Sequence, residues 1–158
     1  METITPVKKA KAPATCKQYK IVKADQGNPI PCKKIISSKE GEEFIRQFYG
    51  DDIEIYESVF VLLLNRASNT IGWAKISQGG ITGAIVDVRL VCKYAVDTLA
   101  TGIILAHNHP SGTLAPSQPD IDITKKIREA LKNFDVQLYD HVILTSDGYY
   151  SMADEGII

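Results

Sequence analysis

Cysteine and histidine are both scarce in this chain, and that scarcity excludes some common kinds of site. Among 158 residues there are three cysteines, Cys16, Cys32 and Cys92, and no two of them form a C-x-x-C pair. An odd and widely spaced set suits neither a disulfide framework nor a cysteine-ligated zinc site. There are also three histidines, so two of them in one short segment is an informative coincidence.

The chain also lacks a long apolar run and a strong net charge. Its longest apolar run, VFVLLL at 59–64, has the length of a strand and is far shorter than the roughly 18 residues of a membrane span. The N-terminus has no apolar segment typical of a secretory signal, so we expect a cytoplasmic protein without membrane contact. A net charge of −1 gives no general reason to expect nucleic-acid binding.

One local exception is the lysine-rich N-terminus. Residues 1–23 contain six lysines and one acid, Glu2. We predict a flexible basic arm over 1–20, with a nucleic-acid-binding or partner-binding tail as the second interpretation. Residues 21–158 are then predicted to form one domain, with its core at 37–158.

Strand and helix patterns alternate along that domain, which predicts a single layered α/β fold. Helices are expected at 39–49, 90–101 and 118–133, the first of them capped by Ser37 or Ser38 and ended by Gly50. Strands are expected at 17–24, 58–65, 70–78, 102–107 and 137–145, with a hairpin-like segment at 147–152.

The segment AHNHPSGTLAPSQPD, residues 106–120, combines two histidines and an aspartate. Residues two apart on a strand point to the same side, so His107 and His109 can both reach one ion at a strand end. Ser117 suits the N-cap of the next helix, and Asp120 then falls in the first helical turn. That placement can return the Asp120 carboxylate to the two imidazoles.

Two imidazoles and one carboxylate suit a single Zn²⁺ ion. Three protein ligands leave a fourth position for water, which is typical of catalytic zinc sites. The pKa of such a water falls to about 7, from about 15.7 in bulk. Two simpler interpretations remain. H-x-H alone is a weak motif, so its two histidines can occur together without binding a metal. Asp120 can be the carboxylate of a capping box and nothing more.

As a whole, HNHPSGTLAPSQPD resembles the metal motif of the JAMM (MPN+) metalloproteases, H-x-H-P followed by S-x-x-D, and most closely that of their RadC branch. The resemblance covers residues 37–158. It includes ESVFVLLLN at 57–65, Arg89 with Ala95, Asp140 with His141, and GYYS at 148–151.

This resemblance implies a JAB/MPN-like fold, a mixed central sheet flanked by helices, related to the cytidine deaminase-like architecture. It also implies a zinc-dependent hydrolase that cleaves peptide or isopeptide bonds of a protein or peptide substrate with a metal-activated water. His107, His109 and Asp120 match the zinc ligands, Glu57 the general base, and Ser117 the serine that stabilises the tetrahedral intermediate. Glu54 competes with Glu57 and is expected to be an exposed surface acid.

Some features depart from the family or leave alternatives open. Val88 stands where the family often has proline, and we do not expect the helix-hairpin-helix region that longer RadC proteins carry. This second departure weakens a DNA role inferred from the family. The alternative function is still a non-catalytic module of DNA repair or recombination, in which the metal is structural and the lysine-rich arm contacts DNA or a partner. A zinc nucleobase deaminase is set aside because H-x-E and P-C-x-x-C are missing. His141 is either a partner of a ligand or a structural histidine.

Overall fold

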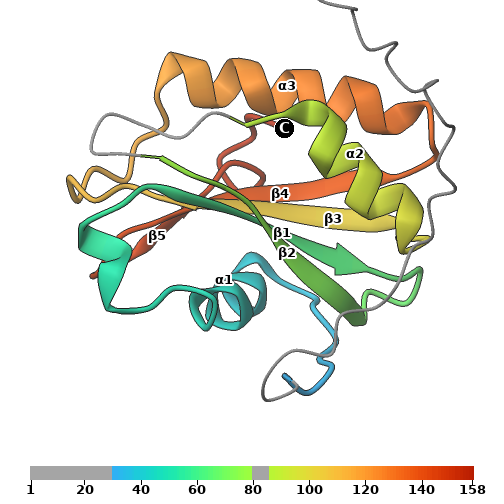
Figure 1. Cartoon of the computed structure of the whole chain (residues 1–158), viewed down its shortest axis with the longest axis horizontal. Helices are drawn as coiled ribbons and strands as arrows, with labels where there is room; N and C mark the ends of the chain where they lie inside the picture. The colour runs from blue at the N-terminus through green and yellow to red at the C-terminus, as the bar shows by residue number, and fades with distance from the viewer. Residues whose placement is uncertain (1–29, 80–85) are drawn as a thin grey trace, which may run out of the picture.

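A computed structural model describes residues 30–79 and 86–158 (Figure 1). The described part forms one five-stranded sheet in the order β2-β1-β3-β4-β5. β3 and β4 are parallel and the other pairs are antiparallel, so the sheet is mixed. The strands are β1 (Ser58–Leu64), β2 (Thr70–Gln78), β3 (Gly102–Asn108), β4 (Gln137–Leu144) and β5 (Tyr149–Ser151). The predicted layered α/β fold is confirmed.

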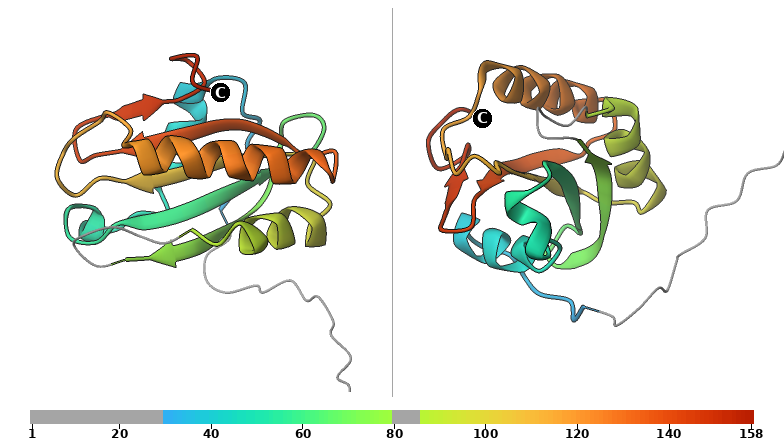
Figure 2. Two further views of the ribbon diagram at one scale, coloured as in Figure 1. Left: turned by 90° about the horizontal axis from the view of Figure 1, so that it is seen from above. Right: turned by 60° about the vertical axis from the view of Figure 1, so that its left-hand side comes forward.

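Helices cover both faces of this sheet. α2 (Val88–Asp97) and α3 (Gln118–Lys132) lie over one face, and α1 (Ser38–Arg46) lies under the other (Figures 1 and 2). A short 3-10 helix, η1 (Asp51–Glu54), leads from α1 towards β1. The predicted arm at 1–20 and the predicted strand at 17–24 fall outside the described residues.

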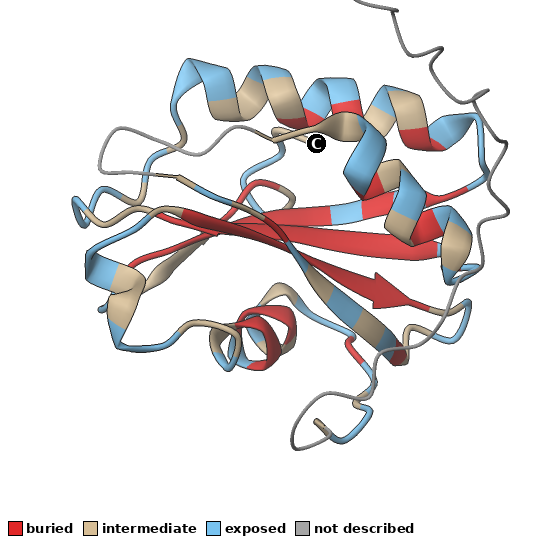
Figure 3. Cartoon of the chain, in the orientation of Figure 1, coloured by how far each residue is buried: buried red, intermediate tan, exposed pale blue. Residues whose placement is uncertain are grey.

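β1 and β3, in the middle of the sheet, are buried along their whole length because both faces are covered. Every residue of β1 and of β3 is buried, as Figure 3 shows, while β2 at the sheet edge mixes buried and exposed residues. Alternation divides each inner strand between two apolar cores. Ile103 and Leu105 pack in the core beneath α2 and α3, and Ile104 and Ala106 pack in the core that includes α1. Nearly continuous apolar runs are what two-sided burial requires.

The boundaries of α1 and α2 differ from the prediction. α1 does begin after Ser37, whose hydroxyl accepts from the backbone N–H of Glu40, but it ends at Arg46 rather than at Gly50. Gly50 is instead the N-cap of η1. The helix is shorter because the chain turns into η1 to reach the start of β1.

α2 begins and ends earlier than predicted. Asp87 is its N-cap and accepts a hydrogen bond from the backbone N–H of Arg89. At the other end Leu99 takes a left-handed conformation, with φ of 54°, and Ala100 N–H donates to the Ala95 carbonyl. That is the six-to-one bond of a Schellman cap, which is usually built on glycine. Leucine at this position gave no sequence signal of a helix end.

Within residues 30–79 and 86–158, none of the helices combines the length and the apolar character needed to cross a membrane.

Candidate metal centre

The site lies at the C-terminal end of β3. His107 occupies the same face as Ile103 and Leu105, towards α3, and it is buried. His109 follows the last strand residue, and its backbone N–H donates to the Leu144 carbonyl of β4 at 2.8 Å. This bond extends the backbone beyond the strand, so the two imidazoles remain on one side.

The turn after His109 returns the chain to α3, which supplies the third side chain. Gly112, with φ of 79°, donates its N–H to the His109 carbonyl at 3.0 Å. Ser117 then caps α3: its hydroxyl accepts from the Asp120 N–H at 3.3 Å, and Asp120 Oδ2 accepts from the Ser117 N–H at 2.7 Å. This capping box sets Asp120 at the third helical position.

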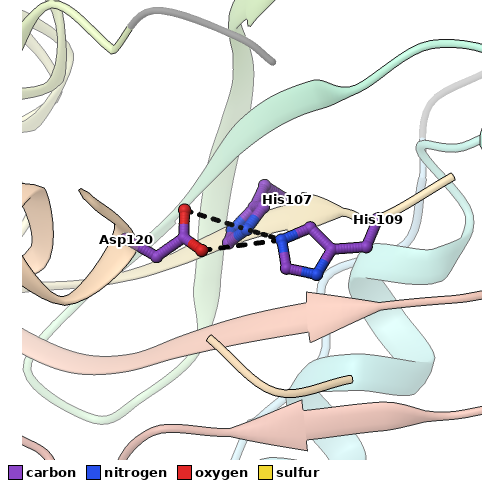
Figure 4. A group of neighbouring side chains, drawn as sticks. All are labelled: His107, His109 and Asp120. Carbon is purple, nitrogen blue, oxygen red and sulfur yellow. Dashed lines mark hydrogen bonds and ion pairs between the residues drawn. The ribbon is translucent and has the colours of Figure 1, made fainter. Parts of the chain in front are cut away.

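The three side chains converge as predicted (Figure 4). His107 Nε2 lies 3.4 Å from Asp120 Oδ1, and His109 Nε2 lies 3.6 Å from Asp120 Oδ2. The two Nε2 atoms are 2.9 Å apart. Asp120 therefore belongs to the capping box and to the His–His–Asp cluster at once, and the two interpretations of this residue are not alternatives.

The three side chains lie close enough together to share one cation. Two ligand atoms bound to the same Zn²⁺ at about 2.0–2.1 Å lie about 3.3 Å apart. The two Nε2 atoms lie 2.9 Å apart, and they lie 3.4 and 3.6 Å from different carboxylate oxygens of Asp120. With one ligand atom taken from each residue, all three lie within 4.8 Å of one another. Two imidazole nitrogens and one carboxylate are also the donor types that Zn²⁺ accepts. His107, His109 and Asp120 could therefore hold a metal ion.

Each imidazole must offer Nε2 without a proton to bind a metal. For His109 this follows from one contact, because Nδ1 lies 2.6 Å from the Thr113 carbonyl oxygen. A carbonyl only accepts, so Nδ1 carries the proton and Nε2 of the neutral ring is free.

The charges within the cluster reinforce one another. The hydrogen bond with Asp120 raises the pKa of His109 above its ordinary value, although partial burial opposes this. Burial by itself raises the pKa of Asp120, but its contacts with His107 and His109 outweigh burial and bring that pKa far below its usual range. The carboxylate is thus ionised, and a metal ion competes with a proton for His109.

Glu57 shares a cavity with two residues of the cluster, His107 and Asp120. This cavity has a volume of about 240 Å³ and is lined by Glu57, Val59, Val86, His107, Pro119, Asp120, Ile123 and His141. Glu57 is half-buried, whereas Glu54 in η1 is exposed, as expected for a surface acid. Pairing of β1 with β3 brings Glu57 there, because Val59 lies opposite His107.

Asn108, between the two histidines, holds the backbone on either side of Glu57. Its Oδ1 accepts from the Ser58 N–H at 2.7 Å, and its Nδ2 donates to the carbonyls of Tyr56, at 2.8 Å, and Ile53. Asn108 is fully buried and faces away from His107. The sequence analysis missed this role, although an amide at the middle of H-x-H was its one available signal.

Two more contacts fix the same junction. The Glu57 carbonyl accepts from the Gly79 N–H at 2.8 Å, and the Ser58 carbonyl accepts from the Tyr49 hydroxyl at 3.1 Å. Burial raises the pKa of Tyr49 well above its ordinary value, and the Glu57 carboxylate adds to that rise. The Tyr49 hydroxyl therefore stays protonated and donates to Ser58.

His141 is a partner of a proposed ligand. Its Nε2 lies 2.8 Å from Nδ1 of His107, and its Nδ1 lies 2.5 Å from the Thr124 hydroxyl. Burial lowers the pKa of His141 well below its ordinary value, and the neighbouring His107 lowers it further. The contact with His107, a proposed ligand, agrees with the first of the two interpretations offered by the sequence. Thr124 was not predicted.

Fold and site together define an α/β domain with a His–His–Asp cluster that could hold a metal ion at the end of a sheet strand. Residues 35–157 match the family of the RadC-like JAB domain, and this chain belongs to that family. The JAB domain family includes metalloproteases, so the predicted relation to JAMM proteins is confirmed.

Several bacterial relatives are similar over most of the chain. A UPF0758 protein of Flavobacterium johnsoniae is 50% identical over 128 residues, which are 81% of this chain and 55% of the relative. A UPF0758 protein of Porphyromonas gingivalis is 46% identical over 103 residues, covering 65% and 45%. A third, from Syntrophomonas wolfei, is 39% identical over 132 residues, covering 82% and 56%. The chain thus spans about half the length of these relatives.

Proposed function

We propose that this chain is a zinc-dependent hydrolase that cleaves peptide or isopeptide bonds in a protein or peptide substrate. The observation that carries the proposal is the shared cavity, in which Glu57 faces the same space as His107 and Asp120. A structural metal site needs three or four ligands but no further acid beside it. An acid there suits proton transfer during hydrolysis.

His107, His109 and Asp120 would hold the zinc ion. Bound there, Zn²⁺ supplies a Lewis acid and lowers the pKa of a coordinated water. The ionised Asp120 carboxylate offsets part of the positive charge, and the hydrogen bond from His109 Nδ1 to Thr113 orients that ring.

Glu57 is proposed as the general base. Its carboxylate accepts a proton from water as the oxygen attacks the carbonyl carbon, and it returns the proton to the leaving amine as the C–N bond breaks. The backbone clamp by Asn108, Tyr49 and Gly79 holds the residue for both transfers. Accurate placement matters because a displacement of about 1 Å can cost about a hundredfold in rate.

Ser117 is proposed as a hydrogen-bond donor to the substrate oxygen as negative charge develops on it. Its hydroxyl here lies 2.6 Å from Asp120 Oδ2 and donates to it. The proposed role therefore needs the hydroxyl to exchange this acceptor for the substrate oxygen. Ser117 is exposed, so it has room to do so.

Comparison of two neighbouring glutamates tests this proposal. Zinc-loaded protein is incubated with a peptide library and with isopeptide-linked peptides, and cleavage is followed by mass spectrometry. We expect Glu57→Gln to lower the cleavage rate by about 10²–10⁴-fold while stoichiometric zinc is retained. Glu54→Gln, in the exposed η1, is the matched control and should leave the rate unchanged.

Two outcomes would contradict the proposal: no cleavage by the zinc-loaded protein, or equal cleavage by Glu57→Gln. The alternative, a non-catalytic module that contacts DNA through residues 1–20, predicts DNA binding that Glu57→Gln leaves intact. It also predicts that removal of residues 1–20 weakens this binding and its strong dependence on salt.

A further inference from the structure

A buried chain of polar side chains extends from the metal centre towards the interior and is not needed merely to provide ligands. It runs from His107 through His141 to Thr124, whose hydroxyl also contacts the backbone carbonyl of Asp120. The exposed fractions of His107, His141 and Thr124 are 2%, 2% and 0%. Polar groups this deeply buried are costly unless every one of them is paired.

The direction of each hydrogen bond can be deduced by starting at the Asp120 carbonyl, where this row of side chains ends. The Asp120 carbonyl oxygen can only accept, so the Thr124 hydroxyl donates its single proton there. Thr124 Oγ must then accept a proton from Nδ1 of His141. A neutral imidazole with its proton on Nδ1 has a lone pair on Nε2.

The proton position on His141 in turn determines the proton position on His107. The lone pair on His141 Nε2 accepts the proton on Nδ1 of His107, 2.8 Å away. Nε2 of His107 is left without a proton, and this atom faces Asp120 and His109. The opposite proton order would break the bond to the Asp120 carbonyl and place a proton on the nitrogen that must bind metal.

We propose that Thr124 and His141 are positioning residues that hold His107 in the tautomer able to bind a metal ion through Nε2. This inference rests on the proposed metal site. The hydrogen bond made by the second ring nitrogen is a known determinant of a histidine ligand's tautomer and orientation.

The two proposed histidine ligands are therefore oriented by different kinds of acceptor for the proton on Nδ1. His109, beyond the strand, uses the carbonyl of a nearby loop residue, Thr113. His107 lies within β3, where backbone carbonyls are committed to pairing with β1 and β4. Nδ1 of His107 therefore needs a side chain as its acceptor, and His141 provides it. The row of hydrogen bonds ends at the backbone carbonyl of Asp120, so α3 both carries one proposed ligand and orients another.

The first test reads the tautomers in zinc-loaded protein, because without a metal ion the 2.9 Å contact between the Nε2 atoms of His107 and His109 needs a proton on one of them. Long-range ¹H–¹⁵N correlation spectra of the imidazoles are recorded at about pH 8, where histidines of ordinary pKa are neutral. Spectra of His109→Ala and His141→Phe assign the resonances of the three rings. We expect both His107 and His141 to carry the proton on Nδ1. A proton on Nε2 of either ring would overturn the inference.

The second test measures zinc affinity by competition with a chelator. We expect Thr124→Val to weaken zinc binding by about 10–100-fold, the effect typical of losing a partner of a metal ligand. Thr124→Ser keeps the hydroxyl and should restore affinity to near that of the unmodified protein. Thr70→Val, another buried threonine with a backbone partner, is the matched control and should not change it. Equal zinc affinities of Thr124→Val and Thr124→Ser would overturn the inference.

Neither readout depends on peptide cleavage. If the tautomers are as stated and no peptide is cleaved, the positioning role stands and the proposed hydrolase falls. If peptides are cleaved by a protein in which His107 carries its proton on Nε2, the positioning role alone falls.

Discussion

The two faces of β3 end in different kinds of polar residue. On the face beneath α3, Ile103 and Leu105 are followed by His107; on the face towards α1, Ile104 and Ala106 are followed by Asn108. Both polar residues are buried, with exposed fractions of 2% and 0%. Because side chains alternate along β3, His107 lies on one face as a proposed metal ligand, and Asn108 lies on the other face, where it binds backbone groups.

The difference lies in what each polar residue binds. His107 makes its contacts with other side chains, His109, Asp120 and His141, so its face should determine metal affinity. Within the described residues, the hydrogen bonds of the Asn108 side chain all go to backbone groups near Glu57, so its face should determine where the general base lies. Substitutions on the two faces are therefore expected to fail in different assays.

The largest expected effect belongs to the His107 face. Zinc binding free energies of about 10–16 kcal/mol shared among four ligands imply a loss of about 10²–10³-fold in affinity when one ligand is removed. We expect this for Asp120→Ala and for His109→Ala, measured by chelator competition. Asp122→Ala, exposed on the same helix, is the control. Stoichiometric zinc of unchanged affinity in both ligand variants would show that the assignment is wrong.

The next effect belongs to the Asn108 face. Asn108→Ala leaves the Ser58 N–H and two carbonyls without their partner, at about 1–3 kcal/mol for each group that stays buried and unpaired. We expect the cleavage rate to fall on the order of 10²-fold through displacement of Glu57.

Zinc affinity should meanwhile stay near that of the unmodified protein. Asn108→Asp keeps the acceptor for Ser58 and should be intermediate in both stability and rate. The contrast between the faces fails if Asn108→Ala loses zinc as severely as Asp120→Ala does.

Zinc binding at the proposed ligands should also depend on pH, because protons compete with the metal ion for His109. Because Asp120 raises the pKa of His109, protons occupy that ring at a higher pH than usual. As pH falls below that pKa, zinc affinity should decrease by about tenfold per unit for each proton displaced. Titration calorimetry over a pH series checks this, with urea unfolding in the same buffers to verify that the protein stays folded. A pH-independent affinity would contradict it.

The smallest effect concerns a position remote from both faces of the site. Leu99 is 83% exposed and holds a left-handed backbone conformation that costs a leucine about 1–2 kcal/mol. Leu99→Gly should raise the free energy of unfolding by about 0.5–1 kcal/mol after the greater freedom of the unfolded chain is subtracted. Leu99→Ala keeps the strain and should show no gain. Neither variant should alter zinc affinity or cleavage rate, which separates stability from site effects.

Local patterns were enough to predict most of the fold. β1 and β3 are buried on both faces, so their apolar runs were legible, and Thr70–Gln78 was predicted without error as β2. α2 was misplaced because its signals, Asp87 at the start and a left-handed leucine at the end, are unusual or easily overlooked.

The site residues that could be predicted from the sequence are those that lie close together along it. His107, His109 and Asp120 lie within one short segment, and their convergence follows from a strand end and a helix cap. Glu57 required the family resemblance, because only the pairing of β1 with β3 brings it near His107. The contact between His107 and His141 spans 34 residues and depends on a parallel β3–β4 register that no local pattern encodes.

A crystal structure of the zinc-loaded protein, with anomalous diffraction recorded at the zinc edge, examines the metal centre most directly. We expect one anomalous peak bound by Nε2 of His107, Nε2 of His109 and the Asp120 carboxylate at about 2.0–2.2 Å. The Glu57 carboxylate should lie within about 2.6–3.2 Å of the fourth, non-protein ligand. An ion bound elsewhere, a fourth ligand from the protein, or Glu57 turned out of the cavity would contradict the proposed hydrolase.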